Sequence, residues 1–523
     1  MTDSRLIAAL QQAQLFDHPV EQFELIETHI SWVILTGPYA YKLRKPVNFG
    51  FLDFTTLEQR FDDCRQELAL NRRFSPELYS GLVRIDGSME QPRLTSIDPQ
   101  QPFDPNAVDY AVQMIEFPQS QLLSERQLNQ QLPEAELEQL AQELALIHAN
   151  APSEPADPSL GHPDTVRAIM LQNFEQIRPY LRQGPSLDQL QRLQQATEVE
   201  FERQLPLLSQ RHAKKQIREC HGDLHLRNIA LYQGRACPFD CIEFNPRYRW
   251  IDPLSDLAFL LMDLQLRGYQ ALANRLLNRY LEHSLDYRPL PLLKLYTAYR
   301  AMVRAKVTLL SSGAADSVLT SQNRLAYQAY VDLAEQTLAP TQARLVLMHG
   351  ASGSGKSWLS QQLIKQGRWI RLRSDRLRHH WHQQQPGELA RYSPEMNLTT
   401  YQNLRQQVES LLREGLSVIV DAAFLQQAQR QSFLQLARQL AIDPTIVSCQ
   451  ANQAMLEQRI KQRMGTENDP SEATIEVLRA QLKDQQSLSS DEQRVTLSVD
   501  TTRTDQVEGC LARLTMDQPC KSG

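Results

Sequence analysis

The eight residues Gly350–Ser357, GASGSGKS, constrain the fold of this 523-residue chain more than any other segment. They fit the pattern G-x-x-x-x-G-K-[ST] and lie between an apolar strand-like run, ARLVLMHG, and a helical stretch. Glycines let the backbone wrap around a phosphate, and the helix that starts there adds positive potential. In such loops the lysine reaches the β- and γ-phosphates and the final hydroxyl binds Mg²⁺. The sequence therefore predicts an ATP- or GTP-binding α/β domain with a parallel sheet, whose nucleotide-binding residues are Gly350, Ala351, Ser352, Gly353, Ser354, Gly355, Lys356 and Ser357, the last also a metal ligand.

Polar residues that follow this loop are candidates for the rest of the site. Asp375 and Arg378 come after the next strand, where a carboxylate can accept a proton from a substrate hydroxyl and an arginine can hold an anion. An N-capping Asp with a surface Arg is the alternative. Asp421 ends a buried-looking strand, where it either orders the Mg²⁺ water shell or caps a helix. Arg459 and Arg463 lie one helical turn apart, and they either close over the transferring phosphoryl group or stay solvated.

A second constellation precedes this domain, in HGDLHLRN at 221–228. In phosphoryl transfer to an alcohol, an aspartate orients the hydroxyl and accepts its proton, and an asparagine a few residues later binds a metal ion. Asp223 and Asn228 have this spacing. The strand-like PFDCIEF adds Asp240 and Glu243 as further candidate metal ligands. The loop can be braced by one of two later aspartates, Asp252 or Asp256.

The segment from about 343 to 505 resembles the small P-loop kinases, which include polynucleotide kinases, zeta-toxin-like kinases and gluconate-kinase-like enzymes. The matching features are the glycine-rich loop, the S-D-R-L-R segment, the VIVDA strand and the arginine-bearing helix followed by DPSEA. The resemblance implies ATP-dependent phosphorylation of a hydroxyl with Asp375 as the base. It does not identify the acceptor.

The segment from about 25 to 335 resembles the aminoglycoside phosphotransferase family of protein-kinase-like enzymes, whose catalytic loop reads H-G-D-x-H-x-x-N. Carried over by position, the resemblance makes Asp223 the catalytic base, Asn228 a magnesium ligand and Asp240 the second metal-binding acid. Lys42, in Ala-Tyr-Lys, matches the lysine that pairs with the nucleotide phosphates, and Glu67 on the following helix is its implied partner. The segment YAVQMIEF falls where the adenine-binding hinge is expected.

The chain departs from this family's pattern at three points. Counting back from Asp252 favours Glu243 over Asp240 as the metal-binding acid, so both stay candidates. Arg227 stands where many relatives carry glycine. The loop expected over the phosphates contains only Gly37, between two segments whose β-branched and aromatic residues predict strands.

Composition excludes several other classes of protein. Hydrophobic residues make up 41% and charged residues 22%, as in folded soluble proteins, and a net charge of -6 gives no bulk basic excess for nucleic acid or membranes. No run of about 18 apolar residues predicts a membrane span. Seven scattered cysteines predict free thiols in a reducing cytoplasm. A local basic run either holds a polyanionic acceptor such as a nucleic-acid end or is a solvated face; it comprises Arg371, Arg373, Arg376, Arg378, His379 and His380.

These observations predict an α/β multidomain protein. A bilobal protein-kinase-like (α+β) domain has its N-lobe at 1–115 and a helical C-lobe with the catalytic loop at 116–338, and the P-loop domain follows at 343–523. The predicted function is phosphoryl transfer from ATP, with Mg²⁺, at two nucleotide sites to hydroxyl acceptors that the sequence does not identify. The alternative is a ligand-sensing pseudokinase coupled to a P-loop ATPase switch. The oligomeric state stays open.

Overall fold

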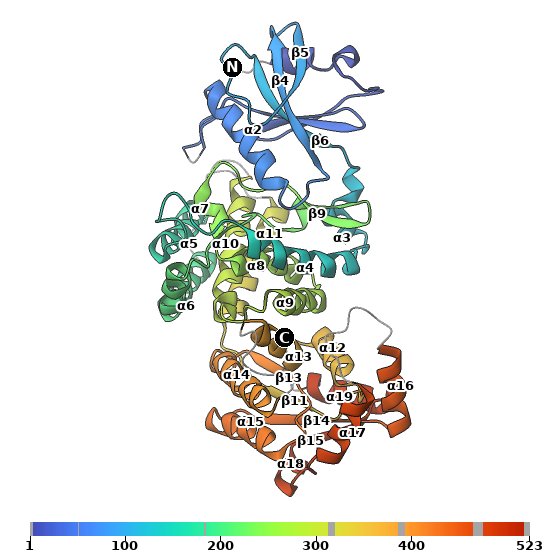
Figure 1. The fold of residues 1–523 in the computed structure, drawn as a ribbon. Coiled ribbons are helices and arrows are strands. Elements are labelled where there is room, and N and C mark those ends of the chain that lie inside the picture. Colours follow the sequence, from blue (N-terminus) through green and yellow to red (C-terminus); the bar gives the residue numbers. More distant parts are fainter. Residues whose placement is uncertain are drawn as a thin grey trace. The chain divides into compact units, whose positions relative to one another are not determined.

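The computed structural model describes residues 4–50, 52–181, 185–311, 320–384, 393–463 and 474–516. The chain forms two compact units (Figure 1). Unit 1 comprises Met1–Arg267 and Leu293–Thr337, and unit 2 comprises Gly268–Leu292 and Leu338–Gly523. The chain therefore passes from one unit to the other three times. Residues 268–292 fall inside the sequence range predicted for the helical C-lobe, but they pack with unit 2.

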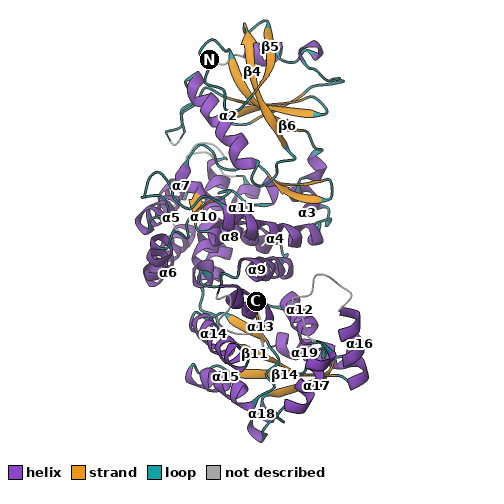
Figure 2. Ribbon diagram, in the orientation of Figure 1, coloured by secondary structure: helices purple, strands orange, loops and turns teal. Residues whose placement is uncertain are grey.

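Unit 1 begins with a six-stranded antiparallel sheet in the order β1-β2-β3-β6-β4-β5. Figure 2 labels β4, β5 and β6 of this sheet. Its strands are β1 (Glu24–Glu27), β2 (Ser31–Leu35), β3 (Tyr39–Arg44), β4 (Tyr79–Gly87), β5 (Pro92–Ile97) and β6 (Asp109–Ile115). The two strands predicted around Gly37 are confirmed as β2 and β3. Helix α2 (Leu57–Asn71) starts at a capping box of Thr56 and Gln59, which satisfies its first amide groups. Its apolar face packs on the sheet through Phe61 and Leu68.

The remainder of unit 1 is mainly helical. Its helices are α1 (Ser4–Ala9), η1 (Ala13–Leu15), η2 (Gln119–Gln121), α3 (Leu123–Leu128), α4 (Glu134–Asn150), α5 (Pro163–Ile177), η3 (Arg178–Tyr180), α6 (Pro185–Ala213), η4 (Leu226–Asn228), α7 (Pro246–Arg249), α8 (Pro253–Leu266), α10 (Leu293–Leu310) and α11 (Ser321–Leu338). Two short antiparallel pairs join β7 (Arg218–Glu219) to β10 (Trp250–Ile251) and β8 (Ile229–Tyr232) to β9 (Arg235–Pro238). Helix α8 is buried almost throughout and packs against α10.

Unit 2 is built on a five-stranded parallel sheet in the order β12-β13-β11-β14-β15. The strands are β11 (Leu345–His349), β12 (Trp369–Arg373), β13 (Ser417–Asp421), β14 (Pro444–Gln450) and β15 (Thr496–Asp500). The helices are α9 (Gln270–Ser284), η5 (Leu290–Leu292), α12 (Lys356–Gln366), α13 (Ser374–Gln384), α14 (Pro394–Arg413), α15 (Gln427–Gln439), α16 (Gln453–Arg463), α17 (Ile475–Asp484), α18 (Ser490–Arg494) and α19 (Thr504–Met516).

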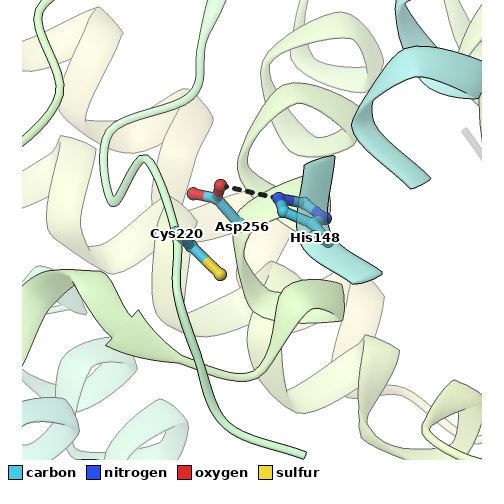
Figure 3. A group of neighbouring side chains, drawn as sticks. All are labelled: His148, Cys220 and Asp256. Carbon is cyan, nitrogen blue, oxygen red and sulfur yellow. Dashed lines mark hydrogen bonds and ion pairs between the residues drawn. The ribbon is translucent and has the colours of Figure 1, made fainter. Parts of the chain in front are cut away.

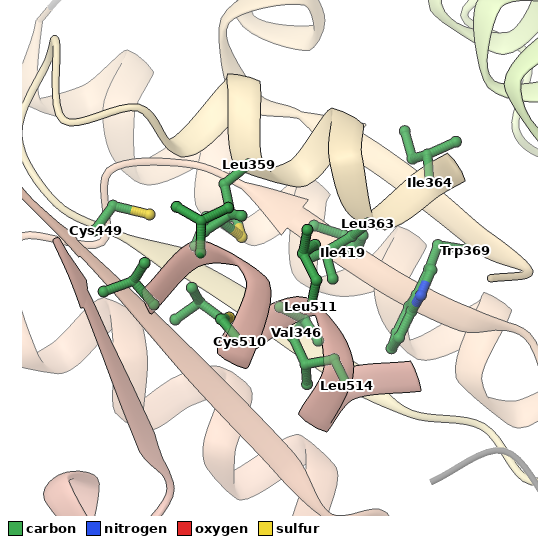
Figure 4. Close-up of a cluster of buried hydrophobic side chains, with 14 residues drawn as sticks. Val346, Leu359, Leu363, Ile364, Trp369, Ile419, Cys449, Cys510, Leu511 and Leu514 are labelled. Carbon is green, nitrogen blue, oxygen red and sulfur yellow. The ribbon is translucent and has the colours of Figure 1, made fainter. Parts of the chain in front are cut away.

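The central strands of unit 2 are apolar because both faces of a parallel sheet are covered. On one face α12 and α19 bury a cluster that includes Leu359, Leu363 and Leu511 against Val346 and Ile419 of the sheet (Figure 4). The crossover connections place the ends of β11, β12 and β13 at one edge, which is where open α/β sheets bind ligands. No helix within the described ranges is long and apolar enough to cross a membrane.

The predicted fold class is confirmed. The six-stranded sheet followed by a helical region has the kinase-like α+β composition, and the C-terminal parallel sheet carries the glycine-rich loop directly after β11.

Candidate functional site

Lys42 lies at the centre of the predicted nucleotide site in unit 1. Its Nζ, on β3, donates to Glu67 Oε1 of α2 at 2.8 Å and to Asp240 Oδ1 at 2.6 Å. The Glu67 side chain is 0% exposed, whereas that of Asp240 is 47% exposed. Burial lowers the pKa of Lys42, but the charges of Asp240 and Glu67 outweigh burial and raise that pKa above its ordinary value. The ammonium group therefore stays charged, held by one buried partner and by one that solvent can reach.

The HGDLHLRN segment brings the predicted base and metal ligand together. Asn228 Nδ2 donates to Asp223 Oδ2 at 2.8 Å, and His225 Nε2 lies 3.3 Å from the same oxygen. Burial raises the pKa of Asp223, but the charge and hydrogen bond of His225 hold that pKa well below its ordinary value overall. Asp223 is consequently ionised at neutral pH and able to accept a hydrogen bond from a hydroxyl group.

Asp240 and Glu243 have different surroundings. Asp240 adopts a left-handed backbone conformation, with φ of 61°, and its carboxylate faces the Lys42 ammonium. Glu243 is buried and accepts a hydrogen bond of 2.6 Å from the Arg44 guanidinium, which also binds Asp63 and Glu67. Burial, together with these neighbouring carboxylates, raises the pKa of Glu243 to about 8. The carboxylates of Asp63, Glu67 and Glu243 lie close enough to share an ion, but Arg44 already supplies the positive charge there.

A buried aspartate braces the HGDLHLRN loop at 221–228. Asp256 accepts hydrogen bonds from the backbone N–H groups of His221 at 3.0 Å and Gly222 at 2.9 Å. His148 Nε2 lies 3.2 Å from the same carboxylate, with Cys220 beside it (Figure 3). Burial raises the pKa of Asp256, but the His148 hydrogen bond and charge lower it overall. Because this carboxylate is already shared by two amides and an imidazole, the His148–Cys220–Asp256 group positions the loop.

Two residues that sequence reasoning missed hold the same loop. Asp263 Oδ2 accepts a hydrogen bond from the Leu226 N–H at 3.0 Å, and Arg300 Nη1 donates to the Gly222 carbonyl at 2.9 Å. The seven-residue spacing of Asp256 and Asp263, two turns along α8, is a signal that could have identified the pair. Asp252, the other candidate brace, instead caps α8 and pairs with Arg211.

The turn between β2 and β3 is tied to the end of β6. Glu116 Oε2 accepts hydrogen bonds from the Thr36 N–H at 2.9 Å and the Gly37 N–H at 2.8 Å. These two amide groups therefore already have a partner within the protein, and the hinge glutamate in YAVQMIEF is that partner.

The glycines of the P-loop are required by close backbone approaches. Gly350 and Gly353 have φ of 140° and 80°. A Cβ on Gly350 would lie 2.5 Å from the Cys449 carbonyl oxygen, and one on Gly353 would lie 2.8 Å from that of Leu456. Helix α12 begins at Lys356, immediately after the loop, so its N-terminal amide groups face the place where phosphate is bound.

Ser357 and Asp421, the two predicted magnesium ligands of unit 2, are linked through Ser360. The Ser360 hydroxyl lies 3.0 Å from the Ser357 carbonyl oxygen and 3.3 Å from Asp421 Oδ2. Asp421 ends β13 and is 5% exposed. Lys356 Nζ donates to the Ala351 carbonyl of the loop at 2.9 Å.

Of the other predicted residues of unit 2 that the structure describes, Arg459 contacts the loop, and Asp375 and Arg378 contact each other. Asp375 is in the first turn of α13 and its Oδ1 lies 3.5 Å from an Arg378 guanidinium nitrogen. Arg459 donates to the Gly353 carbonyl at 3.1 Å and to the Thr501 hydroxyl at 2.9 Å. The side chain of Arg463 and the DPSEA segment lie outside the described part of the chain.

A cavity of about 580 Å³ borders the first half of the P-loop. Its described lining has hydroxyl, amide and imidazole groups and contains no Asp, Glu, Lys or Arg side chain; the polar members include His349, Ser354, Ser448, Gln485, Gln493 and Ser498. Burial lowers the pKa of His349 to about 4, so the imidazole is neutral at pH 7. These walls suit an uncharged, hydroxyl-rich molecule better than a polyanion.

The basic run that begins in β12 and continues into α13 has a partner that the sequence did not indicate. Arg371, Arg373 and Arg376 all form ion pairs with Glu282 of α9. A single acidic residue in an amphipathic helix carries no pattern that would have identified it. These three arginines thus share one acidic partner, Glu282.

Comparison with known proteins identifies two families in the chain. Residues 62–293 match the phosphotransferase enzyme family, and residues 345–488 match an AAA domain. Uncharacterized proteins of Mycobacterium tuberculosis and Mycobacterium bovis are each 29% identical over 482 residues, which cover 88% of this chain and 91% of theirs.

Solved kinase structures are similar to parts of the chain. A gluconokinase from Sinorhizobium meliloti is 17% identical with a TM-score of 0.26, covering 35% of this chain and 99% of its own. An ethanolamine kinase from Plasmodium vivax is 12% identical with a TM-score of 0.37, covering 62% of this chain and 85% of its own. On the family matches, the chain joins a phosphotransferase-family domain at 62–293 to a P-loop, kinase-like AAA domain at 345–488.

Proposed function

We propose that unit 1 transfers the γ-phosphoryl group of ATP to a hydroxyl acceptor. The observations that carry this proposal are two hydrogen-bonded groups, Lys42 with Glu67 and Asp240, and Asp223 with Asn228. Lys42, held by Glu67, binds the phosphates, and the ionised Asp223 orients the acceptor hydroxyl and accepts its proton. Asn228 and Asp240 offer the oxygen ligands that Mg²⁺ prefers, and the ion would neutralise phosphate charge. Glu243 is not needed, because Arg44 engages it.

Unit 2 is proposed to be a second phosphotransferase. The amide groups of Gly350–Ser357 and the Lys356 ammonium would bind the phosphates, and Ser357 and Asp421 would hold Mg²⁺. Asp375, at 37% side-chain exposure, would accept the proton of the acceptor hydroxyl, with Arg378 beside it. Arg459 of α16 donates to the Gly353 carbonyl of the loop and would stabilise charge on the transferring group, together with Arg463.

A small-molecule acceptor is favoured over a nucleic-acid end in unit 2. Glu282 engages three arginines of the basic run that would hold a polyanion, and the cavity beside the loop has uncharged walls. A 5′-hydroxyl oligonucleotide should therefore take up no label from γ-labelled ATP. Labelling that disappears in Asp375→Asn would contradict this preference and favour the nucleic-acid end.

The test is transfer of label from γ-labelled ATP into a cell metabolite extract. We expect label on small molecules, with one product lost in Asp223→Asn and another in Lys356→Ala. Asp223→Asn keeps the side-chain shape and removes the base, so transfer at that site should fall by about 10²–10⁴-fold. Release of free phosphate alone by all three proteins would sink the phosphotransferase proposal. It would favour the ligand-sensing pseudokinase with a P-loop ATPase switch, which should also bind one nucleotide per chain rather than two.

A further inference from the structure

Helix α9 completes the sheet of unit 2. Strand β12 is one of the two outer strands, so one row of its backbone groups has no strand partner among the described residues. The Asn278 side chain takes the place of a neighbouring strand: Nδ2 donates to the Trp369 carbonyl at 2.8 Å, and Oδ1 accepts from the Arg371 N–H at 2.8 Å. Asn274 Nδ2 donates to the Ile364 carbonyl at the end of α12, also at 2.8 Å. The helix is therefore fixed in register with the sheet.

Glu282 lies one turn beyond Asn278 on the same helix face and is 3% exposed. It accepts a hydrogen bond from Arg371 Nε at 2.9 Å and forms ion pairs with Arg373 Nη1 at 3.6 Å and Arg376 Nε at 3.7 Å. Burial raises the pKa of Glu282, but the charges of Arg371 and Arg373 outweigh burial and lower that pKa. One buried carboxylate thus holds three guanidinium groups.

Two of these arginines continue to the proposed magnesium site. Arg371 Nη1 donates to the Ser357 carbonyl at 3.3 Å and to the Ser360 hydroxyl at 3.2 Å. Arg373 Nε lies 3.8 Å from Asp421 Oδ2. Arg373 therefore lies between two carboxylates, Glu282 and Asp421. Weakening its ion pair with one of them strengthens its ion pair with the other.

We propose that Glu282 is a positioning residue for the magnesium site of unit 2. It draws Arg371 and Arg373 toward α9, which keeps the Asp421 carboxylate available to the ion and fixes the backbone at Ser357. This role rests on the proposed function of the P-loop site. Removing the Glu282 charge leaves Arg373 to pair fully with Asp421, where it competes with Mg²⁺.

The test is the Mg²⁺ concentration for half-maximal ATP binding by Glu282→Gln in the full chain. A Lys42→Ala background restricts the readout to unit 2. We expect the Mg²⁺ midpoint to rise by about 10-fold or more, as for other residues that orient metal ligands, with metal-free ATP affinity unchanged. Adding Arg373→Gln removes the competing cation and should restore the midpoint. Asn278→Ala, which disturbs only the sheet edge, should lower stability without moving the midpoint.

The outcomes separate this role from the proposed function. Equal Mg²⁺ midpoints with and without the Glu282→Gln substitution, in the Lys42→Ala background, would overturn the positioning role alone. A raised midpoint that Arg373→Gln fails to restore would do the same. If ATP binding by the Lys42→Ala protein does not depend on the Mg²⁺ concentration, the function proposed for the P-loop is overturned, and the positioning role with it. Should Glu282→Gln unfold, the charge-balanced Glu282→Gln/Arg373→Gln protein still gives the comparison with Arg373→Gln alone.

Discussion

His349 shows how one residue couples the P-loop domain to pH. It ends β11, directly before the loop, and its Nδ1 lies 3.0 Å from the Ser448 hydroxyl. Burial lowers its pKa from 6.5 to about 4, and the nearby Arg430 charge acts in the same direction. The folded protein therefore resists a proton that the unfolded chain accepts below pH 6.5.

Lowering the pH from 7 to 5 should destabilise unit 2. The unfolded state gains a proton that the folded state excludes until about pH 4, so stability is full above pH 6.5 and falls below it. The loss should reach about 2 kcal/mol at pH 5. Hydrogen exchange of the β11 amides, corrected for the intrinsic effect of pH, measures this opening energy. His349→Gln should flatten the dependence, and an unchanged slope would refute the assignment.

At the scale of elements, α8 supports the loop at 221–228. It presents Asp256 and Asp263 to the loop amides and is itself capped by Asp252. Asp256 and Asp263 therefore hold the loop, whereas Asp252 caps the helix.

Asp256→Asn should lower phosphoryl transfer by unit 1 and leave transfer by unit 2 unchanged. The substitution weakens a fully buried acceptor of two amides and an imidazole, which should also cost about 1–3 kcal/mol of stability. Paired measurements of transfer at the two sites and of thermal unfolding check this. Asp252→Asn is the matched control: it should lower stability while transfer falls much less. Equal losses of transfer in both variants would show that α8 acts only through its stability.

The sequence predicted those elements whose chemistry is local. The P-loop motif is contiguous, and the strand before it and the helix after it are confirmed. Lys42 and Glu67 lie 25 residues apart on adjacent elements, and their contact follows the kinase-like pattern. Counting residues could not separate Asp240 from Glu243, because the difference arises from the left-handed turn at Asp240 and from Arg44 on a distant strand. Glu282 meets Arg371 only through tertiary packing.

At the scale of the whole molecule, the chain crosses between the two units after residues 267, 292 and 337. Residues 339–342, which link α11 to β11, are exposed, whereas residues 268–292 stay with unit 2 although they belong to the first part of the chain. Unit 2 is therefore assembled from two separated stretches of sequence.

Cleavage at a protease site placed within 339–342 should leave the two fragments associated. The N-terminal fragment retains α9, whose Asn278 binds the backbone of β12 and whose Glu282 pairs with Arg371 of that strand. Size-exclusion chromatography after cleavage should give one species that separates only in denaturant. Asn278→Ala with Glu282→Ala should weaken the association. Fragments that separate under native conditions without these substitutions would contradict the prediction.

The contact between α9 and the edge strand β12 also constrains how the gene can evolve. A single recombination point in the linker at 339–342 would separate β12 from α9, because the codons for 268–292 lie before that point and those for β12 lie after it. Arg371 and Glu282, 89 residues apart in the chain, must then evolve as one unit, and a change of charge at either favours a compensating change at the other. Neither stretch of the gene can therefore be exchanged for that of another protein unless the contacts between α9 and β12 are rebuilt.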